Sequence, residues 1–362
     1  MNSSSEQANI FIPHSRGVNS YLRLLEEALA KNGVEVVFGR FPTSSDQRQV
    51  SWIHWPEQLT NYSPPSESDL KRIEESLKLA TEHGILLWTV HNAWRHGMRE
   101  HKGFNALYAM VASYADAHLH HGNESVRIIE ELYPGTRKVR RVFNHGGYWN
   151  LLGSESKESA RLALGISDDV KVMLAFGNIR SSSELILSMD ICNVKDWTLL
   201  IAGRPPYIRK RHRISYYYRT LRFKRRIRVC EGLFEDAQID RIVKACDAVL
   251  IPRFECLNSG NVFLGFTFEK PVIGPDIGNV GEILQQTGNE VFDPEVKGDI
   301  IRAVRRLQSR DMEELGEKNA SWLSANCRWE QAAEATIDAI REVQAMKCSR
   351  QALSNSDETI DL

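Results

Sequence analysis

Short apolar runs alternate with amphipathic stretches in the first half of the chain. Asn9–Ile12 and Ile85–His91 are apolar runs, whereas Tyr21–Lys31 and Asp69–His83 carry apolar residues at helical spacing. Such runs are typical of buried strands, and an apolar stripe at helical spacing is typical of a helix packed on a core. Further elements are expected at Val34–Phe38, Ser51–His54, Phe104–Tyr114, Ala117–His120, Ser125–Tyr133 and Val139–Phe143. The alternation predicts a parallel sheet with helices on both faces.

The same alternation resumes after the polar segment Gly153–Glu158, which we interpret as an interdomain connection. Strands are expected at Lys171–Phe176, Trp197–Ala202, Arg226–Cys230, Ala248–Pro252 and Val272–Gly274, and closing helices at Met312–Ser324 and Trp329–Lys347. We therefore expect two doubly wound α/β domains facing one another across a cleft. Their expected ranges are 1–155 and 156–330, followed by a helix over 331–348 and a flexible tail over 349–362.

The composition narrows the function only slightly. The 362 residues are 42% hydrophobic and 26% charged, with a net charge of −1, so no overall charge attracts nucleic acid or a membrane. The six cysteines form no CxxC pair, which indicates reduced thiols and argues against a disulfide framework or a zinc site. No signal peptide is recognisable, and no apolar run approaches the roughly 18 residues of a membrane span. We therefore expect a cytoplasmic protein.

Polar residues follow several expected strands of the first domain. His54 and Glu57 follow one strand, and His91 and His96 follow the next; the last strand leads into His145 and Tyr148. Ligands of parallel sheets bind at the carboxyl ends of strands, so these residues predict a site at one rim. A histidine at a strand end is also commonly structural. Glu57 is the preferred candidate for a general base that deprotonates a hydroxyl, with His91 or His54 as alternatives.

Strand ends of the second domain carry residues suited to an anion. Gly177 and Arg180 follow its first strand, Gly203 and Arg204 follow the second, and the turn Asn258-Ser259-Gly260 precedes an apolar helix. Arginine offers paired charged donors, and a helix start offers free N–H groups, so the set suits a diphosphate. An ordinary helix cap explains Asn258–Gly260 equally well when that turn is taken alone. No DxD pair occurs, so we expect no metal and no other cofactor.

The segment Arg209–Arg228 contains ten Lys or Arg residues and no Asp or Glu. Tyrosines at 216, 217 and 218 and Phe223 lie among them. A solvated helix face and contact with an anionic membrane or a lipid diphosphate are equally compatible with this pattern. Nucleic acid is the least supported ligand, because the chain has no recognisable nucleic-acid module.

The strand-end segments, in this order, resemble GT-B glycosyltransferases of bacterial polysaccharide assembly, in particular the xanthan-type β-mannosyltransferase group and its GT4-like relatives. The matching segments are Asn19–Tyr21, Ile53–Glu57, Thr89–Asn92 with His96, His145–Tyr148, Phe176–Arg180, and Asn258–Gly260 before Lys270-Pro271-Val272. The resemblance implies an acceptor-binding first domain, a second domain that binds the nucleotide sugar, and a final helix that crosses back to the first domain. It also implies that the histidines, Glu57 and Tyr148 lie on the acceptor side, and that Arg180 and Asn258–Gly260 hold the donor.

Two departures from this family stand in the second domain. The family usually has a Lys-Gly pair after the FGxIR-type element, whereas Ser181–Glu184 follows Arg180 here. Retaining GT4 enzymes carry two glutamates before the Lys-Pro pair, and Cys256 and Leu264 occupy those places. The nearby cations Arg204, Arg209 and Lys210 are candidates to replace the missing lysine.

The sequence therefore predicts a hexosyltransferase of polysaccharide biosynthesis. The expected donor is GDP-mannose or a UDP-sugar, and the acceptor is a hydroxyl of a glycan or lipid-linked oligosaccharide. The expected location is the cytoplasm, with peripheral contact at the inner membrane face through Arg209–Arg228. The xanthan-type resemblance implies inversion and the GT4 resemblance implies retention. The alternatives are a non-catalytic GT-B protein that binds glycan or a partner enzyme, and a nucleotide-sugar epimerase or hydrolase.

Overall fold

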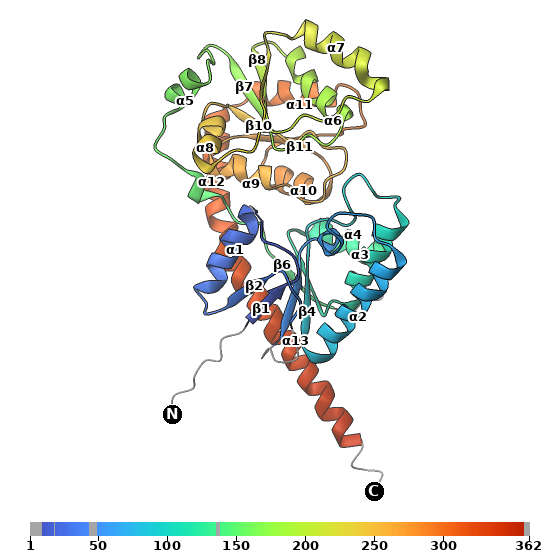
Figure 1. Ribbon diagram of the computed structural model, residues 1–362. Helices are drawn as coiled ribbons and strands as arrows, with labels where there is room; N and C mark the ends of the chain where they lie inside the picture. Colours follow the sequence, from blue (N-terminus) through green and yellow to red (C-terminus); the bar gives the residue numbers. More distant parts are fainter. Residues whose placement is uncertain (1–8, 18, 43–48, 135–137, 358–362) are drawn as a thin grey trace. The chain divides into compact units, whose positions relative to one another are not determined.

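The computed structural model describes residues 9–17, 19–42, 49–134 and 138–357. The chain forms two compact units, each with its own parallel sheet (Figure 1). Unit 1 comprises residues 1–145 and 328–362, and unit 2 comprises residues 146–327. The chain thus passes from one unit to the other at His145, ahead of the polar segment that marked the connection in the sequence.

The sheet of unit 1 has six parallel strands in the order β2-β1-β3-β4-β5-β6. The strands are β1 (Asn9–Ile12), β2 (Glu35–Phe38), β3 (Val50–Ile53), β4 (Ile85–Val90), β5 (Ala117–His120) and β6 (Val139–Val142). The four main helices of its N-terminal segment are α1 (Ser20–Ala30), α2 (Glu67–His83), α3 (Lys102–Tyr114) and α4 (Asn123–Leu132). The predicted doubly wound α/β architecture is confirmed for this unit.

Burial on both faces explains why the central strands of unit 1 are continuous apolar runs. Every residue of β4 is buried, as expected for a strand covered by helices on both sides. Trp52 and Trp88 are completely buried, and the indole N–H of Trp52 donates to Thr89 Oγ1 at 2.8 Å. That bond satisfies a polar group that would otherwise be costly inside the core.

The long C-terminal helix α13 (Trp329–Asp357) belongs to unit 1. It packs beside α1 and against β4, β5 and β6, whereas α2 and α3 pack together elsewhere on the sheet (Figure 1). Lys347 fixes the helix by donating to the carbonyl oxygens of Thr81 at 2.8 Å and Gly84 at 2.7 Å. Helix α13 continues to Asp357, so residues 349–357 are helical, where the sequence indicated an irregular tail.

Unit 2 repeats the architecture with strand order β12-β11-β10-β7-β8-β9. Its strands are β7 (Lys171–Phe176), β8 (Trp197–Ala202), β9 (Ile227–Cys230), β10 (Ala248–Leu250), β11 (Val272–Pro275) and β12 (Glu290–Phe292). Its helices include α5 (Lys157–Ala163), α6 (Ser182–Met189), α7 (Arg213–Arg222), α8 (Asp236–Lys244), α9 (Gly260–Thr267), α10 (Gly278–Gln286), α11 (Asp299–Gln308) and α12 (Met312–Asn326). Within the described residues, no helix is both long and apolar enough to cross a membrane.

Strand β12 is the strand of unit 2 that the hydrophobic pattern did not predict. It is three residues long and begins with the charged Glu290. The Glu290 carboxylate is paired with Arg306 at 2.6 Å and with Arg310 at 3.2 Å. An edge strand this short needs few apolar residues, so it leaves no apolar run in the sequence.

Candidate functional site

Five buried histidines gather at one end of the sheet of unit 1, and four of them contact the ring of Tyr21. His14, His54, His91 and His121 follow β1, β3, β4 and β5, and His145 lies beyond β6; each is at most 8% exposed. Tyr21 lies in the first turn of α1, where Asn19 caps the helix by accepting from the Tyr21 N–H at 2.9 Å. The ring centroids of His91, His145, His121 and His54 lie 4.7, 5.0, 5.4 and 5.7 Å from that of Tyr21. The strand ends thus bring together three predicted histidines, at positions 54, 91 and 145.

Burial favours the neutral form of the His54, His91 and His121 imidazoles. His54 Nδ1 and His91 Nε2 are 3.1 Å apart and share a hydrogen bond, and Trp55 stacks on His91 with centroids 4.3 Å apart. Burial, followed by repulsion from neighbouring histidines, holds the pKa of His54 and of His91 well below the usual value. Burial lowers the pKa of His121 to about 4. These imidazoles are therefore uncharged at neutral pH.

Sequence reasoning missed His14 and His121 as members of the cluster. His121 directly follows the predicted strand β5, so its position at a strand end was a signal that could have identified it. His14 follows β1 after Pro13 and gives no motif of its own in the sequence. Its Nε2 is buried without a hydrogen-bond partner among the described residues, as is Nε2 of His54. Burial lowers the pKa of His14 as well.

Glu57 lies in the short helix η1 (Pro56–Thr60) that follows β3, and is almost completely buried. Its Oε2 accepts a hydrogen bond from the Tyr108 hydroxyl of α3 at 2.6 Å. Burial raises the pKa of Glu57, and the bond from Tyr108 and the charge of Arg95 partly offset that increase. A carboxylate with a raised pKa is suited to proton transfer, although the same bond to Tyr108 also stabilises the packing of η1 on α3.

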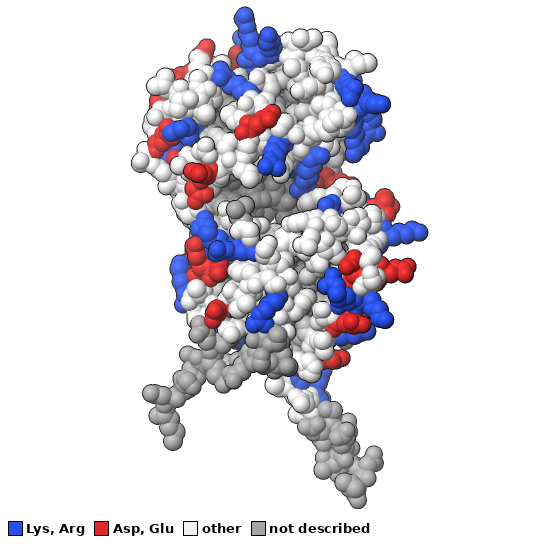
Figure 2. All heavy atoms as spheres, viewed as in Figure 1, with Lys and Arg blue, Asp and Glu red and all other residues white. Residues whose placement is uncertain are grey.

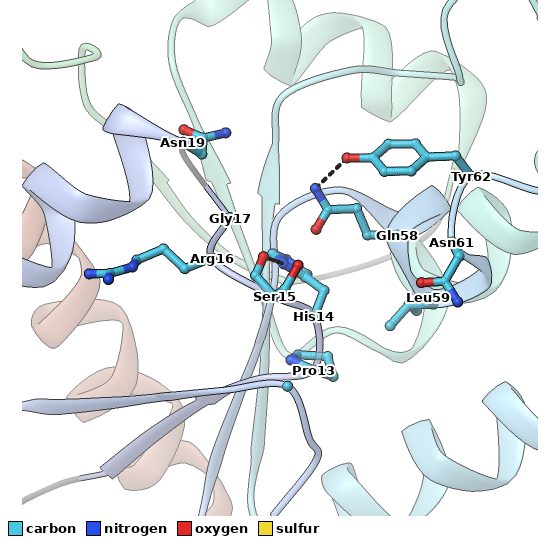
Figure 3. A pocket seen from close by; sticks show the side chains of 11 residues that line it. Pro13, His14, Ser15, Arg16, Gly17, Asn19, Gln58, Leu59, Asn61 and Tyr62 are labelled. Carbon is cyan, nitrogen blue, oxygen red and sulfur yellow. Dashed lines mark hydrogen bonds between the residues drawn. The ribbon is translucent and has the colours of Figure 1, made fainter. Parts of the chain in front are cut away.

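A polar hollow of about 680 Å³ opens beside this region of unit 1 (Figure 3). It is lined by the loop between β1 and α1, which includes His14 and Asn19, and by residues of η1 and the turn that follows it, Gln58, Asn61 and Tyr62. Gln58 Nε2 donates to the Tyr62 hydroxyl at 2.6 Å across its rim. Asn61 and Tyr62 both adopt left-handed backbone conformations, with φ of 48° and 62°. Such strain in consecutive residues is characteristic of functional loops.

The three predicted acceptor residues lie in different surroundings. His145 belongs to the histidine cluster, where its ring is 5.2 Å from that of Trp329 in α13. His96 is half-buried in the loop after β4, beyond the cluster. Tyr148 belongs to unit 2, where it packs on the hydrophobic core and its N–H donates to Thr267 Oγ1 at 2.9 Å. The chain passes between the units within these few residues.

The first two strands of unit 2 end in glycines that touch one another. Gly177 follows β7 with φ of +86°, and Gly203 follows β8 with φ of +146°. A Cβ on Gly203 would lie 2.1 Å from the Gly177 carbonyl oxygen, so no other residue fits there without displacing the backbone. The glycines leave the carboxyl ends of these strands open to a ligand.

A buried ion pair, which no sequence pattern indicated, joins the β7 and β10 loops. Arg253 Nη1 lies 2.6 Å from Glu184 Oε2, and Arg253 Nη2 donates to the Asn178 carbonyl oxygen at 2.8 Å. Glu184 Oε2 also accepts from the Arg180 N–H at 2.7 Å, and Ser181 caps α6. The segment Ser181–Glu184, where the resembled enzymes have Lys-Gly, thus starts a helix and holds Arg253.

Arg180 and Arg204 both carry exposed side chains at these strand ends. The Arg180 guanidinium donates to the Glu255 carbonyl oxygen at 3.4 Å, which places it beside the β10 loop. Arg204 has no hydrogen-bond or ion-pair partner in the described part of the chain. Two guanidinium groups at consecutive strand ends match the charge of a diphosphate.

The predicted helix start at Asn258–Gly260 is present, and its side chains are occupied in holding the loop. Ser259 is the N-cap of α9 and accepts from the Asn261 N–H at 3.4 Å. Asn258 Oδ1 accepts from the Asn279 side chain of α10 at 2.7 Å, and the Asn261 amide donates to the Phe176 carbonyl oxygen at 2.8 Å. These bonds draw the N-termini of α9 and α10 toward the end of β7. The positions that hold glutamates in retaining GT4 enzymes are here the buried Cys256 and Leu264.

The residues that the structure describes include no three His, Cys, Asp or Glu side chains arranged to hold a metal ion. The five histidines of the cluster contact aromatic rings. Four of them contact Tyr21, and His14 contacts Trp55.

No protein-family model and no curated protein matches this chain. Solved structures match it over most of its length. HepE from Anabaena in complex with UDP-glucose aligns with a TM-score of 0.69 and 12% identity, covering 92% of this chain and 99% of that chain. Sucrose-phosphate synthase from Thermosynechococcus elongatus aligns with a TM-score of 0.68 and 16% identity, covering 94% and 100%. WaaG, a glycosyltransferase involved in lipopolysaccharide biosynthesis, aligns with a TM-score of 0.59 and 13% identity, covering 90% and 98%.

These similarities establish the fold. The chain has the two Rossmann-like units of GT-B glycosyltransferases, and the expected fold class is confirmed in this respect. At such low sequence identity, the shared fold does not show that this chain has the same substrates as these proteins or uses the same residues.

Proposed function

We propose that this protein is a glycosyltransferase that moves a hexosyl group from a nucleotide diphosphate sugar to a hydroxyl of a glycan or lipid-linked oligosaccharide. The observation that carries the proposal is the open strand-end surface of unit 2. Two contacting glycines, two exposed arginines and two helix N-termini gather there at the carboxyl ends of β7, β8, β10 and β11. A site with this chemistry binds a diphosphate without needing a metal.

The donor is proposed to bind unit 2 through its diphosphate. Arg180 and Arg204 supply charge, and the starts of α9 and α10 supply N–H groups and the positive ends of their helix dipoles. These groups stabilise the negative charge that develops on the departing nucleotide, which is the largest electrostatic change in the reaction. HepE, which has the same fold, was crystallised with UDP-glucose and with UDP. GDP-mannose and UDP-sugars are therefore the first donors to test.

The acceptor is proposed to bind unit 1. The hollow beside η1 presents amide and hydroxyl groups, including Asn19, Gln58 and Tyr62, which suit a polyhydroxylated sugar. Glu57 is our first candidate for the general base, because burial raises its pKa above the usual value. His91 is the second candidate, and His54 would then hold its ring through the shared hydrogen bond. All six cysteines are free thiols, which fits a cytoplasmic location.

Replacement of Arg204 or Arg180 by alanine is expected to weaken nucleotide binding by roughly tenfold or more. A charged hydrogen bond contributes about 1.5–3 kcal/mol, and neither side chain belongs to the core. Titration calorimetry with UDP, GDP, UDP-glucose and GDP-mannose in metal-free buffer measures the effect. Arg302→Ala is the matched control, because Arg302 forms an exposed pair with Asp299 one turn away on α11. Equal affinity of Arg204→Ala, Arg180→Ala and wild type for every nucleotide bound would contradict the proposed donor site.

The reaction class is tested by incubating the protein with each radiolabelled nucleotide sugar and a membrane lipid extract. Label in the lipid fraction together with released nucleotide supports transfer, provided that Glu57→Gln abolishes the label without altering nucleotide affinity. Free sugar in the absence of acceptor would indicate a hydrolase instead. The absence of binding to any nucleotide sugar would overturn the proposal in favour of a non-catalytic protein.

A further inference from the structure

Helix α7 of unit 2 is attached to its domain by one face only. Tyr216 and Phe223 pack on the hydrophobic core, and Arg219 on the same side is paired with Asp190 at 2.8 Å. These residues recur at helical spacing, so they form one stripe along the helix. No residue of α7 itself is buried. The helix therefore lies on the surface of unit 2.

The opposite face of α7 is apolar and open to solvent. Ile214, Tyr217, Tyr218 and Leu221 follow the spacing i, i+3, i+4, i+7 of a single helical face. They are 86%, 61%, 58% and 77% exposed. Scattered exposed apolar residues are ordinary on a protein surface, but a continuous stripe along one helix marks a site of interaction. We call these four residues the α7 stripe.

Cations border the α7 stripe and no acidic residue interrupts them. Arg213 and Arg222 lie on its two sides; Arg222 donates to the Tyr218 hydroxyl at 3.4 Å, and Arg213 to the Tyr207 hydroxyl at 3.2 Å. Further exposed cations precede and follow the helix, namely Arg209, Lys210, Arg211, Lys224 and Arg225. Lys and Arg side chains gather in Figure 2 at the margin of the unit where Figure 1 draws α7. An apolar stripe edged by cations is the pattern of a helix that lies in a membrane interface.

We propose that α7 docks on an anionic lipid surface, with the α7 stripe inserted among the acyl chains and the bordering cations at the level of the headgroups. Long basic side chains reach the headgroups while their stems cover apolar surface. A second copy of this chain is a poorer occupant, because a two-fold contact would bring the same cations face to face. Binding of nucleic acid would not account for the exposed apolar side chains of Ile214 and Leu221. The proposal concerns membrane attachment and does not depend on the donor site.

Flotation with phosphatidylcholine vesicles that contain about one third phosphatidylglycerol tests the proposal. Wild type is expected to float with these vesicles and to stay unbound with phosphatidylcholine alone. The double variant Ile214→Ser/Leu221→Ser is expected to lose at least about tenfold in vesicle affinity, since insertion of apolar side chains provides part of the binding. Lys224→Gln/Arg225→Gln is expected to lose roughly fivefold per charge. Leu162→Ser is the matched control, because Leu162 is an 83% exposed leucine on α5 of the same unit.

Three results would overturn the proposal. The first is an absence of wild-type protein from the floating fraction at low salt. The second is equal flotation of Ile214→Ser/Leu221→Ser and wild type. The third is binding of single-stranded DNA or RNA that Tyr217→Ala abolishes, without any binding to vesicles. Circular dichroism of each variant verifies that α7 and the rest of the fold are retained, and the assay needs no nucleotide sugar.

Discussion

Lowering the pH from about 7.5 to about 5 is expected to destabilise unit 1 by several kcal/mol, with little effect on unit 2. The cause is the set of buried histidines of unit 1. Burial lowers the pKa of His118 to about 4, of His120 to about 3 and of His121 to about 4, and it lowers those of His14, His54 and His91 as well. These imidazoles must stay neutral in the folded chain, whereas in the unfolded chain they take up protons below their usual pKa of about 6.5.

The direction of this change in stability follows from proton uptake. Below about pH 6.5 the unfolded state binds more protons than the folded state, so stability falls as the pH falls. The loss continues down to the folded-state pKa values, which lie near 3 to 4 for His118, His120 and His121. At pH 5 each such histidine costs about 2 kcal/mol, since one pH unit corresponds to about 1.4 kcal/mol per proton. Three of them together approach the whole stability of a typical domain.

Chemical denaturation at a series of pH values measures this dependence. Replacing His121 by glutamine removes one titrating group, so the stability difference between pH 7.5 and pH 5 should shrink by about 2 kcal/mol. His83→Gln is the matched control, because His83 is exposed at the end of α2. If His121→Gln and wild type lose stability equally on acidification, the buried histidines are not the cause.

Arg253→Ala is expected to destabilise unit 2 by about 3–5 kcal/mol, the usual cost of removing one partner from a buried ion pair. The substitution leaves the Glu184 carboxylate buried without its cation and frees the Asn178 carbonyl oxygen. It also removes a hydrogen bond that joins the β7 loop to the β10 loop, so the proposed donor site should lose order together with stability. Thermal unfolding of the full chain, with and without nucleotide, measures both effects.

Two comparisons isolate the buried pair as the cause. The double variant Arg253→Met/Glu184→Leu removes both charges and should recover much of the loss, because no unpaired charge then remains inside. Arg341→Ala, which breaks a surface pair with Asp338, should change stability by less than about 1 kcal/mol. A loss for Arg253→Ala as small as that of Arg341→Ala would contradict the structural role of the pair.

The central strands of both sheets were predictable because burial on both faces leaves unbroken apolar runs. Ile85–Val90 and Trp197–Ala202 are such strands, and every residue in them is buried. The helix start at Ser259 was predictable from N-cap chemistry. Strand β12 was not, because pairing with β11 defines it and its first residue is charged.

Site residues that directly follow a strand could be predicted from the sequence. Site residues that are defined by contacts between distant segments could not. Strand ends alone indicated His54, His91, Gly177 and Gly203. The bond from Tyr108 to Glu57 and the pairing of Arg253 with Glu184 join residues far apart in sequence. No local sequence pattern predicts such pairs, because the packing of the loops determines which residues come into contact. Arg253 in particular has the sequence appearance of an ordinary surface arginine.

The division of the chain into units has a consequence for how the protein is made. Unit 1 is built from two distant segments, and unit 2 is one continuous stretch between them. During synthesis, unit 2 can complete its sheet while α13 is still unmade. In unit 1, the side of β4, β5 and β6 that α13 covers stays exposed until α13 emerges from the ribosome. Unit 1 is therefore completed after unit 2, although its larger segment precedes unit 2 in the chain, and it depends more on protection of its apolar surface during synthesis.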